Sequence, residues 1–419
     1  MQSIHKTLQE RKQEREMAND IATNWKVLSG EKNWEDLLDP IDDNLRRYLI
    51  RYGQLTGTVG DAFNDVKVSD AYALCRYPPE AYFTRTGIQL GNPFKYQVTD
   101  YFYGRSEIHF SEWTPAKRSA YFGFVAVATD EGKLALGRRD IVVCWRGTVL
   151  KIEWFKDFDC TLTSASDIFP NTKAKVHHGF HGIYATKDSD STYNKTSARE
   201  QVLGAVRRLV DKYAELNEEV SITVTGHSLG AALATLNAMD IAANGYNKPS
   251  GSETVYPVTA FVYASPRVGD KAFREVFTGL SDLHLLRLKN NKDIVPDLPV
   301  PVPIIFPYED VGVELYIDTT KSPSIKHESI AEAHDLNLYL HGVAGYQGKN
   351  AAFNLVITDL DIALVNKHND LLTDDRKVPP KWWSNVPNKG MIQIDIGFWK
   401  LNDYIPDPPS DDASENGTN

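Results

Sequence analysis

One serine in this 419-residue sequence has the neighbours that a nucleophile needs. It is the central residue of Gly226-His227-Ser228-Leu229-Gly230, a G-x-S-x-G pentapeptide. β-branched residues precede the pentapeptide, and small and apolar residues at helical spacing follow it, which predicts a strand, a sharp turn and a helix. A serine at such a turn has a strained backbone, and a glycine on each side gives it room. The pattern therefore predicts that Ser228 attacks an acyl carbon.

The same turn offers a place for the negative charge that develops during acyl transfer. The backbone N–H of Leu229 comes at the start of the predicted helix, where N–H groups have no partner inside the helix. Together with the positive end of the helix dipole, these donors can stabilise an oxyanion. We expect Leu229 to form part of an oxyanion hole beside Ser228.

A serine nucleophile also needs an acid and a base, and chain order narrows the choice. In α/β-hydrolases the acid follows the serine and the histidine follows the acid. Asp293 and Asp297 share one loop, just past a predicted strand that ends at Asn290, so both are candidate acids. The histidines beyond Asp293 are His327, His334, His341 and His368. Of these, His334 and His341 lie at or near the start of a predicted helix, and the residues alone leave both open as the base.

Strands that alternate with helices must position these residues. Apolar runs predict strands at 121–129, 140–146 and 222–225, and two more that end near Ser265 and Asn290. Between them, helical patterns of about a dozen residues or more recur, and this alternation is typical of a mostly parallel α/β sheet. The predicted fold is an α/β-hydrolase with helices flanking the sheet, N-terminal helices, and a small C-terminal β extension.

An apolar stripe follows Gly147-Thr148, at the end of the predicted strand over 140–146. Its members recur at helical spacing: Leu150, Trp154, Phe155 and Phe158. Such a stripe can pack in the core, or it can be a lid whose apolar face covers the site in water and opens onto lipid. The residues alone favour neither role.

Composition argues against several other functions. The net charge is −10 and no basic stripe is present, which disfavours nucleic acid as a partner. No stretch reaches the length of a transmembrane segment, and the N-terminus lacks the apolar region of a secretory signal. The cysteines are three, an odd number at uninformative spacing. We expect a reduced, cytoplasmic protein.

Three histidines lie close together in the sequence: His177, His178 and His181. No acidic residue or cysteine completes a ligand set within this stretch, and Gly179 and Gly182 indicate close packing. We therefore expect no metal site here. Serine acyl transfer also requires no metal and no organic cofactor.

Six blocks of sequence resemble the class 3 lipase family, which includes fungal triacylglycerol lipases and plant acyl hydrolases. They are IVVCWRGT, VHHGF, TVTGHSLGAALATL, YASPRVGD, NKDIVPDLP and HDLNLYLHGVAG, and they follow the family order over about 140–346. Outside them, NWKVLSGEKNWEDLLDPIDDNLRRYLIRYG, NKGM and FWKL resemble the plant phospholipase A1 group, of the cytosolic type. The resemblance covers nearly the whole chain.

The resemblance implies a role for each candidate. It makes Ser228 the nucleophile, Asp293 the acid and His334 the base. It implies that Thr148 donates its backbone N–H to the oxyanion hole together with Leu229, and that 149–158 is a lid with Trp154 facing the site. Fungal members are secreted and usually carry disulfides. Because we expect neither feature in this chain, we also expect that fungal substrate preferences do not transfer.

The resemblance also implies a substrate and a setting. It favours a phospholipase A1 that releases the sn-1 chain of phospholipids such as phosphatidylcholine, acting transiently at a membrane or lipid-droplet surface. A galactolipase, a triacylglycerol lipase or an esterase for soluble esters would use the same triad. A non-catalytic, lipase-like binding protein is a further alternative, which a degraded triad would support.

Composition and the resemblance together divide the chain into five parts. We expect a charged segment at 1–20, a helical region packed on the core at 21–110, the class 3 lipase core at 111–346, an extension with short strands at 347–404, and a disordered acidic tail at 405–419.

Overall fold

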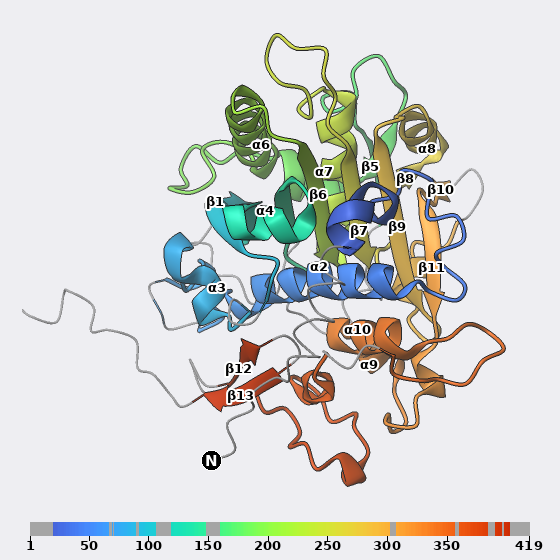
Figure 1. The fold of residues 1–419 in the computed structure, drawn as a ribbon. Coiled ribbons are helices and arrows are strands. Elements are labelled where there is room, and N and C mark those ends of the chain that lie inside the picture. Colours follow the sequence, from blue (N-terminus) through green and yellow to red (C-terminus); the bar gives the residue numbers. More distant parts are fainter. Residues whose placement is uncertain are drawn as a thin grey trace, which may run out of the picture.

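A seven-stranded sheet forms the centre of the structure, which is a computed structural model (Figure 1). The structure describes residues 20–66, 69, 71–88, 92–105, 119–147, 160–301, 307–356 and 360–383, and the backbone of 390–395 and 398–402. In spatial order the strands are β1 (Tyr96–Gly104), β2 (Ala120–Ala128), β3 (Arg139–Trp145), β6 (Val220–His227), β7 (Val258–Tyr263), β9 (Leu283–Asn290) and β11 (Val313–Ile317).

The sheet is mostly parallel, which confirms the predicted fold class. β3, β6, β7, β9 and β11 run parallel to one another, whereas β1 and β2 are antiparallel to their neighbours. The central strands read as continuous apolar runs because helices cover both faces of the sheet. The edge strand β1 begins at Tyr96, so the sheet starts before the expected core boundary at 111.

Two helices that cover opposite faces hold the central strands between them. On β6, the Thr225 hydroxyl bonds that of Thr56 on α2 (Asp43–Asp61) at 2.8 Å. On the other face, Trp145 at the end of β3 donates its indole N–H to the Asn237 side chain on α7 (Leu229–Ala243) at 3.1 Å. α2 is the predicted N-terminal helix on the core, and it begins where the Asp42 side chain accepts N–H bonds as its N-cap.

The remaining helices extend these two layers. α5 (His178–Ala185) and α6 (Ala198–Glu215) lie with α7, and α10 (Leu336–Gly345) packs on α2. The shorter helices are α3 (Tyr82–Arg85), α4 (Asp130–Leu136), α8 (Lys271–Thr278) and α9 (Ile330–Ala333), with 3-10 turns at Pro79–Ala81, Val295–Asp297, Thr319–Lys321, Ile362–Asn366 and Asp374–Arg376. No helix in the described part of the chain is both long and apolar enough to cross a membrane.

Two small sheets complete the fold. The first is antiparallel, in the order β10 (Tyr308–Glu309), β8 (Gly269–Asp270), β5 (Lys175–His177) and β4 (Leu162–Ser164). The second is the hairpin of β12 (Gly390–Asp395) and β13 (Phe398–Asn402), which confirms the expected C-terminal β extension.

A fully buried carboxylate joins the amino ends of β3 and β6. One oxygen of Asp140 accepts hydrogen bonds from Tyr52 at 2.7 Å and Tyr96 at 2.6 Å. The other accepts from Ser221 at 2.6 Å and Thr223 at 2.8 Å. Burial, together with the Asp140 charge, raises the pKa of Tyr52 and of Tyr96, so both phenols stay protonated and keep donating. Every lone pair of this buried charge is thereby used.

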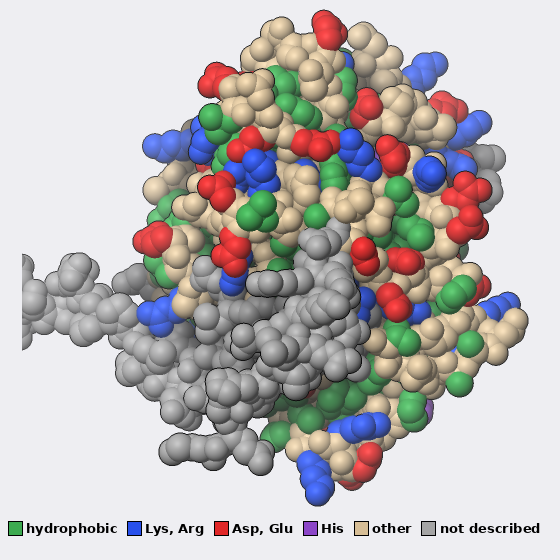
Figure 2. All heavy atoms as spheres, in the orientation of Figure 1, with side chains coloured by type: hydrophobic (Ala, Val, Ile, Leu, Met, Phe, Trp, Pro, Cys, Tyr) green, Lys and Arg blue, Asp and Glu red, His purple; other side chains and the backbone are tan. Residues whose placement is uncertain are grey.

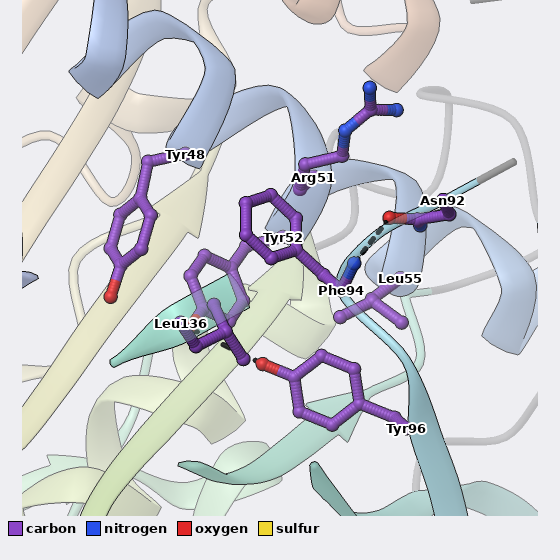
Figure 3. A pocket seen from close by; sticks show the side chains of 8 residues that line it. All are labelled: Tyr48, Arg51, Tyr52, Leu55, Asn92, Phe94, Tyr96 and Leu136. Atoms are coloured by element: carbon purple, nitrogen blue, oxygen red, sulfur yellow. Dashed lines mark hydrogen bonds between the residues drawn. The ribbon is translucent and has the colours of Figure 1, made fainter. Parts of the chain in front are cut away.

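A small cavity lies beside this cluster (Figure 3). Its lining residues come from α2, α4, the start of β1 and the segment that leads into it: Tyr48, Arg51, Tyr52, Leu55, Asn92, Phe94, Tyr96 and Leu136. Its volume is about 10 Å³, which is room for roughly one water molecule. The cavity is therefore no substrate pocket.

The charges on the described surface are mixed in sign. On the face in Figure 2, Lys and Arg side chains lie among Asp and Glu side chains without forming a continuous basic stripe. Several are paired, such as Arg139 with Asp130 and Glu218.

Candidate active site

Ser228 lies at the sharp turn between β6 and α7, as the pentapeptide predicted. Its backbone has φ 58° and ψ −125°, a conformation that costs a non-glycine residue roughly 1–3 kcal/mol. Neighbouring backbone groups fix it: the Ser228 N–H donates to the Tyr263 carbonyl on β7 at 3.0 Å, and the Ser228 carbonyl accepts from Ala231 at 2.9 Å. The side chain accepts no capping bond from α7, which leaves its oxygen available for chemistry.

The two glycines of the pentapeptide are required by close backbone contacts. A Cβ atom at Gly226 would overlap the carbonyl oxygen of Gly230. One at Gly230 would overlap the carbonyl oxygen of Trp145, at the end of β3. The turn is therefore closed on both sides of Ser228, and larger residues at either glycine would force strand and helix apart.

Asp293 and His334 form a hydrogen-bonded pair. Asp293 lies in the loop that follows β9, is 1% exposed, and accepts from Nδ1 of His334 at 2.7 Å through Oδ2. Its Oδ1 accepts the backbone N–H of Val295 at 2.9 Å. His334 lies between the short helices α9 and α10. Since Nδ1 carries the proton in this bond, Nε2 is the nitrogen that can act as a base.

Asp297 and His341, the alternatives that the sequence left open, lie in other surroundings. Asp297 has a side chain 51% exposed and pairs with the Lys289 ammonium at 2.6 Å. His341 is buried, its Nε2 bonds the Ser322 hydroxyl at 2.8 Å, and its ring stacks on Phe353. Burial lowers the pKa of His341 to about 4. The geometry therefore brings Asp293 together with His334 and leaves both alternatives out of the pair.

A short contact connects this pair to the serine turn. His227, the last residue of β6, precedes Ser228, and its Nε2 bonds the His334 carbonyl at 2.8 Å. The centroids of the two imidazole rings are 4.8 Å apart. The turn after β6, the segment between α9 and α10 and, through Asp293, the loop after β9 thus meet at the carboxyl edge of the sheet, where α/β folds place their reactive groups.

Tyr339 is a residue of the site that the sequence reasoning missed. Its hydroxyl donates to Asp293 Oδ2 at 2.6 Å and accepts the Asn290 N–H at 3.1 Å. Burial raises the pKa of Tyr339, and the Asp293 charge raises it further, so the phenol remains protonated. The only sequence signal was its place five residues after His334, on the predicted helix.

We expect Tyr339→Phe to lower kcat about 10-fold with KM nearly unchanged, because a hydrogen bond to a charged group is worth roughly 1.5–3 kcal/mol. Steady-state kinetics on purified protein measure this. Tyr184→Phe is the matched control, because the buried Tyr184 hydroxyl donates to another buried carboxylate, Asp240, at 2.7 Å. Equal losses of kcat in the two variants would contradict a role for Tyr339 in the site.

The oxyanion side of the site is described up to Gly147. A Cβ atom on Gly147 would lie 2.7 Å from the His227 carbonyl oxygen, so the loop after β3 runs close against the serine turn. Arg146 fixes this loop by donating to the Gly147 carbonyl at 3.1 Å. Leu229 is the first residue of α7, as expected. Thr148 and the stripe residues lie outside the described residues: Leu150, Trp154, Phe155 and Phe158.

The three clustered histidines make separate contacts. His177 is buried, accepts the Gly179 N–H at 3.0 Å and stacks on Phe180. His181 bonds Asp167 at 2.9 Å, and His178 is exposed. Within the described part of the chain, no group of three or more His, Cys, Asp or Glu side chains is arranged to hold a metal ion.

The sequence is similar to known proteins over most of its length. Residues 142–302 match the model of the class 3 lipase family. Phospholipase A1-IIgamma of Arabidopsis thaliana is 45% identical over 413 residues, which cover 94% of this chain and 96% of that protein. Phospholipase A1-II 1 of Oryza sativa subsp. indica is 44% identical over 401 residues, which cover 93% and 98%.

Solved lipase structures are more distant. The triacylglyceride lipase of Rhizomucor miehei is 20% identical, with a TM-score of 0.42, and the match covers 66% of this chain and 82% of that one. A lipase of Yarrowia lipolytica is 19% identical, with a TM-score of 0.44, and the match covers 70% and 85%.

Proposed function

Since this chain belongs to the plant phospholipase A1 group of the class 3 lipase family, we propose that it hydrolyses the sn-1 acyl ester of phospholipids such as phosphatidylcholine. The observation that carries the proposal is the Asp293–His334 pair at 2.7 Å, joined through His227 to the strained turn of Ser228. A nucleophile, an ordered base and a buried acid are the parts that acyl transfer needs.

The first half of the reaction is acyl transfer to the enzyme. His334 Nε2 takes the proton from Ser228 Oγ as the oxygen attacks the ester carbonyl. The Asp293 carboxylate holds the ring and stabilises its positive charge. Backbone N–H groups of Leu229 and Thr148 donate to the oxyanion. The C–O bond of the ester then breaks, and the His334 imidazolium returns the proton to the departing lysophospholipid oxygen.

The second half is hydrolysis of the acyl-enzyme. His334 takes a proton from a water molecule, whose oxygen attacks the acyl carbon bound to Ser228. The C–O bond to Ser228 breaks, Oγ regains its proton from His334, and a free fatty acid leaves. Each step uses groups of this chain, the substrate and water.

We place the reaction at a lipid surface in the cytoplasm, that of a membrane or a lipid droplet. Exposed apolar side chains near the site residues in the sequence support contact with lipid: Ile294, directly after Asp293, is 44% exposed, and Ile330, four residues before His334, is 49% exposed. The loop of Ile294 and the loop that leads into α9 are neighbours, because the Lys292 ammonium donates to the Glu328 carbonyl at 3.4 Å. In this proposal, segment 149–158 is the lid that opens when these loops meet the surface.

The positional claim is tested with mixed-chain phosphatidylcholine. We expect vesicles with palmitate at sn-1 and oleate at sn-2 to yield palmitate first, and lipid with the two chains exchanged to yield oleate first. Comparing the two lipids separates position from chain preference. Early release of the sn-2 chain from both lipids would overturn the positional claim. If galactolipid or triacylglycerol vesicles were cleaved faster, that lipid and not the phospholipid would be the substrate.

A further inference from the structure

We propose that His227 is a positioning residue that holds His334 and the loop after β3 in register with Ser228. The inference rests on the proposed function, because it assigns a role within the same triad. His227 itself touches no reacting atom in the mechanism above. It acts through the backbone of the catalytic histidine.

The contact to His334 has a defined direction. A carbonyl oxygen can only accept, so the 2.8 Å bond requires that His227 Nε2 carries the proton and donates it to the His334 carbonyl. The two rings pack at 4.8 Å with a tilt of 40°, and the Tyr339 ring lies edge-on at 6.3 Å. The side chain therefore fixes both the backbone of His334 and one side of its imidazole.

The other side of His227 faces the loop after β3, which contains Gly147. A Cβ atom at Gly147 would lie 3.6 Å from His227 Nδ1 and 2.7 Å from its carbonyl oxygen. Residue 148 is the next along the chain. One residue thus contacts two segments that must converge on Ser228, and its own backbone continues directly into that serine.

His227 is also suited to this place because it is uncharged. Burial, and then the neighbouring His334, lower the pKa of His227 to about 3. The ring therefore stays neutral throughout the physiological range and presents no second positive charge when His334 becomes an imidazolium. Two neighbouring cations would oppose the proton transfer from Ser228.

Two amide variants separate positioning from simple packing. Glutamine can place an N–H donor where histidine has Nε2, whereas the asparagine amide ends near the place of Nδ1 and falls short of the His334 carbonyl. We expect His227→Asn to lower kcat about 30-fold with KM within twofold, since a displacement of about 1 Å at a catalytic group can cost on the order of 100-fold. His227→Gln should keep at least about a third of kcat.

His341→Gln is the matched control, since His341 is also buried and also bonded through Nε2, but to Ser322. We expect it to change stability and leave kcat near the wild-type value. Kinetics on phosphatidylcholine vesicles and thermal unfolding of all three variants make the comparison. Equal kcat values for His227→Asn and His227→Gln, or a loss confined to KM, would overturn the inference.

A second readout keeps this test separate from the proposed substrate. The rate at which a fluorophosphonate labels Ser228 depends on the serine and its base but not on a phospholipid. We expect the same order of rates: wild type, then His227→Gln, then His227→Asn far below. If the wild-type protein were labelled but released no fatty acid, the proposed phospholipase activity would be refuted. The labelling rates of the variants would then still test the role of His227.

Discussion

Ser228→Ala is expected to lower kcat for phospholipid hydrolysis by roughly 10⁴-fold or more while the fold is retained. The variant removes the only oxygen that can form the acyl-enzyme in the proposed mechanism. It removes no capping bond, because the Ser228 side chain makes none to α7. We therefore expect the free energy of unfolding to stay within about 1 kcal/mol of the wild-type value.

A matched serine is expected to behave in the opposite way. Ser197 caps α6, where its side chain and that of Glu200 form a reciprocal capping box. We expect Ser197→Ala to cost about 1 kcal/mol of stability and to leave kcat unchanged. Fatty-acid release and thermal unfolding, measured on both variants, give four values to compare. Substantial hydrolysis by purified Ser228→Ala would refute the nucleophile.

The second large effect is expected at Asp293. We expect Asp293→Asn to lower kcat by about 10³- to 10⁴-fold. An asparagine amide turned toward His334 Nδ1 would donate instead of accept, which selects the tautomer that protonates Nε2. A histidine in that tautomer cannot accept the proton of Ser228. KM should change little, because the carboxylate contacts the histidine and not the lipid.

Asp297→Asn is the control for this variant, since both residues lie in one loop. Asp297 is half exposed and pairs with Lys289, an interaction worth about 1 kcal/mol or less at a surface. We expect its kcat to equal that of the wild type. If Asp297→Asn instead matched the loss in Asp293→Asn, the assignment of the acid would be wrong.

The turn at Ser228 and the central sheet could be predicted because their sequence signals are local. The apolar runs of β3 and β6 reflect burial on both faces of the sheet. Gly226 and Gly230 are required by backbone contacts within a few residues or with the adjacent strand. Chain order then limited the acid and base to a few residues. These steps required no knowledge of long-range distances.

The choice among these candidate acids and bases depends on contacts between residues far apart in the sequence. Asp293 and Asp297 differ by four positions in one loop, and only the path of the chain between α9 and α10 decides which one meets His334. The same holds for Tyr339, which resembled any core tyrosine on a helix. His227 was visible in the motif, but its contact with His334 joins residues 107 positions apart.

The buried Asp140 cluster, at the end of the sheet opposite the active site, affects how the catalytic groups are aligned. β3 and β6 pair with Asp140 opposite Ser221, and each of these lies seven residues before a residue of the site, Gly147 and Ser228. A slip of two residues would displace one loop from the other by about 7 Å and leave the carboxylate without its serine donor. The cluster therefore fixes the register between β3 and β6. Hydrogen bonds at the end of the sheet away from the substrate thereby align Ser228 with the loop after β3.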